Sequence, residues 1–442
     1  MLPPSHKDHI ALDTDDALYR KLNSEWDQAL NEVRQQPGFA QFLRPKLMTE
    51  LRVSATNGPI IILNASKSTC AAFIVTASQD VRCVRLDNMS FDYAQFLVEL
   101  LRATLKGSLV QISQFLAHSR QTSGKSPVML QRLLGKLENE EDYNPDDVFR
   151  AMLKVLWENV VRPVFNILKL KKSDSPSRLW WCPTGPFTFL PIHAAGLYEE
   201  LGTDSVSDYV VSSYTPTLTS LLDPHTEAVS AFKMTAVIQP ETPGLPSLPA
   251  TRNELLRIRK VVPQKWLTSL GDTPEATVDI ATRHLKKSSV VHFACHGTQD
   301  LQNPLETGLH LTDGRLRVSE FMRGTDHVAR KKSMSLAFLS ACETAKGDDN
   351  APDEAMHLAA TLLFSGFRGV VATMWTMADA DGPEIAEPFY EYLFKGCDAD
   401  ADPPVLPDLT KGAEALHIAV AKLRTDPTVS FTRWVPFVHY GL

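Results

Sequence analysis

The sequence has 442 residues, 43% of them hydrophobic and 22% charged, which is typical of a soluble globular protein with two or three domains. It contains 45 Lys and Arg against 52 Asp and Glu, so its formal net charge is −7. This acidic balance argues against nucleic acid or a membrane as a partner, and no apolar run is long enough to span a bilayer. The polar N-terminus lacks the apolar core of a secretory signal, and the six cysteines follow no disulfide or zinc spacing. We therefore expect a cytoplasmic protein.

The N-terminal part of the chain is predicted to combine helices with a small sheet. Residues 1–56 have the apolar spacing of a helical segment. Apolar, β-branched runs at 59–64, 70–76 and 81–86 then favour a small antiparallel or mixed sheet. Further strands are expected at 178–183 and 209–214, with a second short strand after the turn that follows residue 183. The expected helices are 93–116, 145–170 and 217–222.

The C-terminal part alternates strands with helices. The expected strands are 234–238, 266–270, 290–295, 336–341 and 369–375, and the expected helices are 251–261, 274–285, 353–364, 382–394 and 410–423. A hairpin is predicted at Asp313-Gly314. Continuous apolar strands that alternate with helices indicate a mostly parallel sheet covered on both faces. We therefore divide the chain into a helical segment (1–56), an α/β domain (57–230) and a second α/β domain (231–442).

Two of the predicted strands end in potentially reactive residues. The run VVHFACHG leads into His296-Gly297, and LAFLSACET leads into Cys342. If the two strands are neighbours in a parallel sheet, His296 and Cys342 face each other across the crevice at its carboxyl edge. A thiol beside an imidazole can act as a nucleophile, and the N–H groups of Gly297 and Cys342 can hold an oxyanion. The alternative is that Cys342 is an ordinary buried thiol.

These two segments resemble the paired signatures of the CHAT proteases, a caspase-like family related to separase. Other segments are similar to the family as well: 180–197, 209–218, 248–258, 354–375 and 434–441. The similarity covers about residues 175–442 firmly, and the part before it resembles fungal-type members. The resemblance implies a caspase-like sandwich, with a mostly parallel sheet flanked by helices, preceded by an α+β pseudo-protease-like half.

The resemblance also implies an activity. A member of this family is a cysteine endopeptidase in which Cys342 attacks the scissile carbonyl and His296 donates a proton to the leaving amine, without a cofactor or metal. Its partner is a protein or peptide substrate. Relatives act in regulated cell death, so we expect regulated activation, with an activating protein partner as one possibility. The alternative is a catalytically silent, caspase-like interaction module.

An acidic loop after Trp375 is the candidate for substrate selection. By similarity to separase, Asp379 is the better match and Asp381 the second match to the aspartate that pairs with a basic P1 side chain. The resemblance therefore implies cleavage after a basic residue. The alternative for Asp381 is a cap on the following helix.

Other motifs give weaker indications of function. His292 and His296 have the spacing of a zinc helix, but they lack a glutamate between them and lie in a β-branched run. The alternating aspartates at 398–402 lack the glycine and distal glutamate of an EF-hand. The acidic stretch 348–353 is either a gating loop or a solvated loop that ends in a helix cap. The basic run 330–332 is either an exposed turn or a self-cleavage point.

Overall fold

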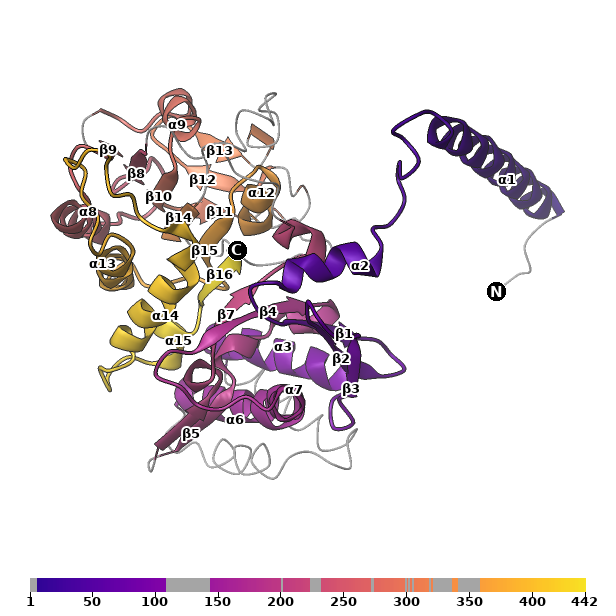
Figure 1. Cartoon of the computed structure of the whole chain (residues 1–442), viewed down its shortest axis with the longest axis horizontal. Coiled ribbons are helices and arrows are strands. Elements are labelled where there is room, and N and C mark those ends of the chain that lie inside the picture. The colour runs from indigo at the N-terminus through magenta and orange to yellow at the C-terminus, as the bar shows by residue number, and fades with distance from the viewer. Residues whose placement is uncertain are drawn as a thin grey trace. The chain divides into compact units, whose positions relative to one another are not determined.

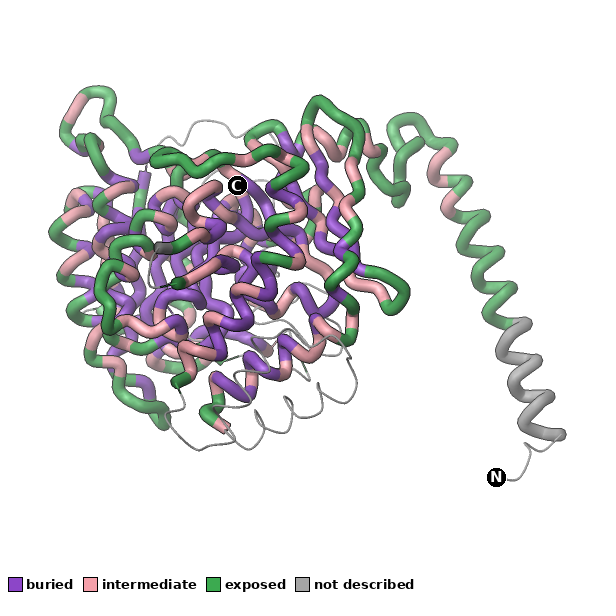
Figure 2. Tube along the Cα trace, turned by 90° about the horizontal axis from the view of Figure 1, so that it is seen from below, coloured by how far each residue is buried: buried purple, intermediate pink, exposed green. Residues whose placement is uncertain are grey.

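The computed structural model describes residues 6–108, 144–199, 202–222, 232–271, 274–298, 300, 303, 306–317, 319–320, 336–340 and 358–442. The chain forms two compact units, Met1–Leu51 and Arg52–Leu442. The first unit holds helices α1 (His6–Arg34) and α2 (Met48–Leu51). Along α1, residues 18–29 are all exposed, including Leu22 and Trp26 (Figure 2). No helix in the described part of the chain has the length and apolar character that a membrane span requires.

The second unit is built on one eleven-stranded sheet (Figure 1). The strand order is β3-β2-β1-β4-β7-β16-β15-β14-β10-β8-β9. Neighbours are antiparallel at β3–β2, β2–β1 and β16–β15, and parallel at the other pairs. The strands are β1 (Ile60–Ala65), β2 (Cys70–Val75), β3 (Arg82–Arg85), β4 (Ser177–Pro183), β7 (Val210–Tyr214), β8 (Met234–Ile238), β9 (Leu267–Leu270), β10 (Val290–Ala294), β14 (Leu336–Ser340), β15 (Gly369–Thr373) and β16 (Phe437–Gly441). The predicted mostly parallel sheet is confirmed.

Helices cover both faces of the C-terminal part of this sheet. In Figure 1, α8, α13 and α14 form a row on one side of β10, β14 and β15, and α9 and α12 lie on the other side. The helices of the second unit are α3 (Phe91–Leu105), α6 (Pro145–Leu156), a π-helical turn η2 (Trp157–Val161), α7 (Arg162–Leu168), α8 (Ala250–Val261), α9 (Val278–Leu285), α12 (Leu358–Phe364), α13 (Asp381–Leu393), α14 (Gly412–Leu423) and α15 (Phe431–Trp434). Strands covered on both faces are apolar at most positions, which explains their nearly continuous hydrophobic runs.

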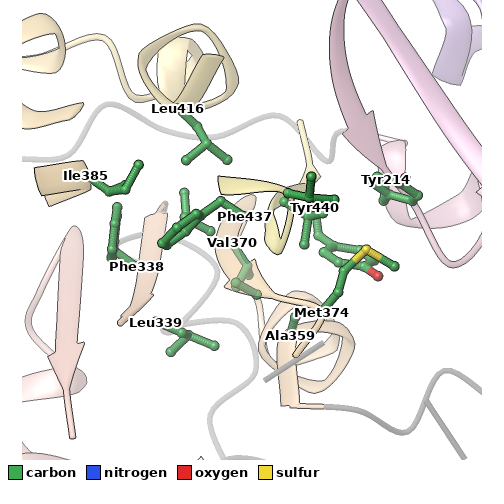
Figure 3. Packing of buried hydrophobic residues seen from close by; sticks show 14 of the residues in the cluster. Tyr214, Phe338, Leu339, Ala359, Val370, Met374, Ile385, Leu416, Phe437 and Tyr440 are labelled. Carbon is green, nitrogen blue, oxygen red and sulfur yellow. The ribbon is translucent and has the colours of Figure 1, made fainter. Parts of the chain in front are cut away.

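The core lies between the sheet and these helices. Every residue of β8, β10, β14, β15 and β16 is buried. Figure 3 shows side chains from both parts of the sheet in one cluster, with Tyr214 near Tyr440 and Phe338 near Ile385. The rings of Tyr214 and Tyr440 lie 5.6 Å apart between centroids, so the core continues from β7 into β16. The sheet crosses the predicted boundary at residue 230 without a break, and that boundary stays a prediction.

The structure differs from the prediction where prolines interrupt the chain. After β4 the expected turn and strand are two short 3₁₀ helices, η3 (Gly185–Phe189) and η4 (Ile192–Ala194). Pro186 lies inside the first and Pro191 immediately before the second, and proline cannot donate to a strand ladder. The expected helix at 217–222 is likewise a 3₁₀ turn, η6 (Leu218–Leu221).

Small accessory sheets lie outside the large one. Strands β11 (Gly297–Thr298), β12 (Gly308–His310) and β13 (Arg315–Arg317) form a three-stranded sheet, which confirms the hairpin at Asp313-Gly314. A second hairpin, β5 (Gly196–Glu199) and β6 (Gly202–Ser205), was not predicted. A 3₁₀ turn, η5 (Val206–Asp208), connects it to β7.

Candidate active site

The two strands that carry the candidate residues are neighbours. Strand β10 pairs with β14 in parallel, and Ala294 lies opposite Ser340 at their carboxyl ends. His296 follows Ala294 by two residues, and Cys342 follows Ser340 by two residues. The predicted adjacency of the strands is therefore confirmed. Cys342 itself lies outside the described residues, as do the stretches 330–332 and 348–353.

His296 is held by a backbone carbonyl. Its Nε2 lies 2.8 Å from the oxygen of Pro246, and the ring is half-buried. Because a carbonyl oxygen only accepts hydrogen bonds, Nε2 carries a proton and Nδ1 is the nitrogen of the neutral ring that can exchange one. Pro246 lies four residues before the start of α8, and no sequence motif marks this segment as part of the site.

A neighbouring histidine fixes the backbone at this strand end. The N–H of His310 donates to the oxygen of His296 at 2.8 Å, and the His310 Nε2 lies 2.7 Å from Thr298 Oγ1. Burial, followed by the charges of Arg315 and His296, lowers the pKa of His310. His310 came from no sequence motif, because it belongs to a different hairpin strand.

The N–H of Gly297 points away from strand β12. Gly297 lies opposite Leu309 in the antiparallel ladder, and the next pair along, His296 with His310, is hydrogen-bonded. Hydrogen-bonded and non-bonded pairs alternate along such a ladder, so Gly297 is a non-bonded position whose N–H is not used by β12.

Asp379 and Asp381 occupy different environments. Asp379 is half-buried, and its Oδ2 accepts a hydrogen bond of 2.8 Å from the N–H of Ala250, the first residue of α8. A carboxylate at this position stabilises the helix N-terminus. Asp379 thus secures the end of the segment whose Pro246 carbonyl holds His296.

Asp381 is completely buried and its carboxylate is paired with Arg433. The Arg433 Nε lies 3.0 Å from Oδ1 and 3.2 Å from Oδ2, and a second guanidinium nitrogen also contacts Oδ1. The hydrogen bonds to Asp381 raise the pKa of Arg433. The helix cap is Ala380, so Asp381 is the first residue of α13 and does not cap it with its side chain.

A buried polar network lies beneath the strand ends. Glu254 on α8 accepts a hydrogen bond of 3.1 Å from Ser340 Oγ, and its other oxygen lies 3.0 Å from His292 Nε2. The other ring nitrogen of His292 lies 3.0 Å from the Tyr390 hydroxyl on α13. The network joins α8, β10, β14 and α13, the elements that carry or adjoin the candidate residues. His292 is therefore a member of a core network, and the zinc interpretation of its spacing has no support.

No group of three or more His, Cys, Asp or Glu in the described ranges could hold a metal ion. In the aspartate-rich loop, Asp398 Oδ1 accepts from the N–H groups of Asp400 and Ala401, at 2.9 and 3.2 Å. That carboxylate stabilises its own turn.

The fold is similar to that of known cysteine proteases. The structure matches separase of Saccharomyces cerevisiae, solved in complex with securin, with a TM-score of 0.52 and 12% identity. That match covers 89% of this chain and 31% of the separase, so the chain spans about a third of the separase length. The Arg-specific cysteine proteinase gingipain R of Porphyromonas gingivalis matches with a TM-score of 0.42 and 9% identity, over 64% of this chain and 68% of the proteinase. No curated protein matches the chain.

The sheet, its flanking helices and the separase match define a protein with the caspase-like fold of cysteine proteases. The profile of the CHAT domain family matches residues 150–442, about two thirds of the sequence. The chain belongs to the CHAT domain family.

Proposed function

We propose that this protein is a cysteine endopeptidase that uses Cys342 and His296. The observation that supports this most directly is the 2.8 Å contact between His296 Nε2 and the Pro246 oxygen. It fixes the tautomer and the orientation of the ring at the end of β10, beside the strand that leads to Cys342.

The proposed reaction has two steps. The Cys342 sulfur attacks the scissile carbonyl carbon and forms a tetrahedral intermediate, and its thiol proton is taken up by His296 Nδ1. His296 then gives the proton to the amine nitrogen, the C–N bond breaks, and the acyl group remains on sulfur as a thioester. Water hydrolyses the thioester, which releases the acid and restores the thiol.

Charge on the intermediate is stabilised by backbone donors in this proposal. The Gly297 N–H is not used by strand β12, which supports its assignment as one donor of the oxyanion hole, with the Cys342 N–H as the other. No cofactor takes part.

We propose that Asp379 selects substrates by pairing with a basic side chain at their P1 position. Asp379 is half-exposed at the carboxyl edge of the sheet, whereas the Asp381 carboxylate is buried and already paired with Arg433. A carboxylate at the site favours a guanidinium or ammonium group in the S1 pocket.

We further propose that a protein partner regulates this activity in the cytoplasm, in the setting of regulated cell death. Separase was solved in complex with securin. Because this protein and separase share the caspase-like fold, that complex supports a protein partner for this protein.

The test is covalent labelling with peptidyl acyloxymethyl ketones that differ only at P1. We expect an arginine or lysine probe to add once to the native protein, with peptide mapping placing the adduct on Cys342. The Cys342→Ala protein should show no adduct, and His296→Ala should label much more slowly. A Cys83→Ser protein is the matched control, because Cys83 is an exposed thiol away from the strand ends.

Two outcomes contradict the proposal in different ways. Equal labelling by aspartate and arginine probes removes the assignment of Asp379 but leaves the peptidase. If no probe labels native Cys342, while iodoacetamide alkylates it in denatured protein, the free chain has no formed active site and the silent interaction module is favoured.

A further inference from the structure

A cavity of about 430 Å³ lies between strands β7 and β16, where the two parts of the large sheet meet, and is called the seam cavity below. Strands β7 and β16 are paired through a single register, Tyr214 with Tyr440, whereas the other neighbours in the sheet pair over three to six residues. The ladder does not continue to the other end of β7 and β16, where Val210 and Phe437 line the cavity. Helix α14 and the turn η5 form its other walls. The two parts of the sheet therefore enclose the cavity jointly.

One arginine is held in a fixed orientation in this cavity. The guanidinium carbon of Arg424 lies 4.4 Å from the ring centroid of Trp434 and 5.5 Å from that of Tyr198. Its Nη1 donates to Ser207 Oγ at 3.0 Å. This bond uses one of several N–H donors of the guanidinium. Across the described residues Arg424 has no carboxylate at ion-pair distance.

The other charged side chain that lines the cavity, Asp208, has an ion-pair partner that it shares with Asp204, because Lys172 Nζ lies 3.0 Å from the Asp204 carboxylate and 3.4 Å from that of Asp208. Asp208 also accepts a hydrogen bond of 2.8 Å from the N–H of Ser205. Burial and the charge of Arg424 lower the pKa of His417, and burial lowers the pKa of His193 to about 4, so both rings are neutral near pH 7. Of the charged side chains that line the cavity, Arg424 is therefore the one without an ion-pair partner among the described residues.

We propose that the seam cavity binds a small amphipathic carboxylate. Its anionic group pairs with Arg424, and its apolar chain lies against Val210, Leu416 and Val438, which line the same cavity. The cavity volume is within the range of small-molecule sites, which often lie between domains. A ligand here contacts both parts of the sheet and stabilises the folded chain. The site shares no lining residue with His296, Gly297, Asp379 or Asp381, so it is independent of the proposed peptidase.

The test uses the full 442-residue chain with hexanoate and its neutral analogue hexanamide. At about pH 7 we expect saturable one-to-one binding of hexanoate by titration calorimetry and a higher melting temperature. Hexanamide should bind at least roughly 10-fold more weakly, because it lacks the charge-assisted hydrogen bonds. The Arg424→Gln substitution should lower the affinity for hexanoate by a similar factor. Lys422→Gln is the matched control, because it removes the same charge from an exposed position of α14 and should leave binding unchanged.

A second variant tests the cavity without removing the packing of Arg424 on Trp434. Ala421 is exposed and lines the cavity, so Ala421→Trp blocks the space from the mouth and should abolish hexanoate binding. The Cys342→Ala protein should bind like the parent, which separates this site from the peptidase. The proposal is overturned if the parent gives no saturable hexanoate binding, if hexanamide binds equally well, or if Ala421→Trp binds hexanoate like the parent.

Discussion

His292 Nε2 lies 3.0 Å from Glu254 Oε1, and the two side chains are only 0% and 2% exposed. The pair connects α8, which follows the Pro246 segment, with β10, which ends just before His296. Ser340 adds β14 through its hydrogen bond to the other Glu254 oxygen. Burying polar groups costs free energy, and contacts between them offset part of that cost. The network thus fixes the relative positions of the elements around the candidate site.

Replacing Glu254 by Ala should strongly destabilise the protein. The change leaves His292 and Ser340 buried without their partner, and each buried polar group left unpaired costs about 1–3 kcal/mol. We expect this loss in the free energy of unfolding from urea titration. The matched control is Glu384→Gln on α13, because Glu384 pairs with Arg257 at the surface and such pairs contribute roughly 0–1 kcal/mol. Equal losses for the two variants would contradict the interpretation.

Much of this arrangement was predictable from sequence, and the remainder depends on contacts distant in the chain. Apolar runs such as VVHFA and LAFLS predicted buried parallel strands, and their polar ends predicted the position of His296. The Pro246 carbonyl and Glu254 were not predicted, because a backbone acceptor has no sequence signature and a glutamate in a helix ordinarily faces solvent. Their roles arise only when α8 packs beside β10.

The pair between Asp381 and Arg433 should show strong energetic coupling. Asp381 is buried and Arg433 lies partly exposed on α15, so removing the guanidinium leaves a buried carboxylate without its counter-charge. In a double-mutant cycle of Asp381→Asn and Arg433→Met, measured by urea unfolding, we expect a coupling of about 1–3 kcal/mol. If the two substitutions change the free energy of unfolding additively, solvent replaces the Arg433 guanidinium at no cost in stability.

Asp379 should separate stability from specificity. Asp379→Ala removes the acceptor for the Ala250 N–H and should cost roughly 0.5–2 kcal/mol, while Asp379→Asn keeps an acceptor oxygen and should cost less. Both variants should lose the preference for arginine over norleucine at P1, measured as the ratio of labelling rates. Asp400→Asn, which removes an exposed charge, is the control for both readouts. Retained arginine preference in Asp379→Asn would exclude Asp379 as the P1 determinant.

Stability should fall as the pH drops from about 6.5 to about 4. Burial lowers the pKa of His193 from 6.5 to about 4, so below pH 6.5 the unfolded chain binds a proton that the folded chain does not. One such group contributes a slope of about 1.4 kcal/mol per pH unit within this window. The buried His439 acts in the same direction, because its pKa is lowered too. In the His193→Gln protein, the slope of the unfolding free energy against pH should therefore decrease by the contribution of about one proton and not vanish. Identical slopes for this variant and the parent would refute the assignment to His193.

The position of β16 has a consequence for biosynthesis. This strand lies between β7 and β15 in the sheet, yet it follows every other strand of that sheet in the chain. During translation the earlier strands emerge from the ribosome first, and the two parts of the sheet cannot join until residues 437–441 are available. The large sheet is therefore complete only when residues 437–441 are in place between β7 and β15.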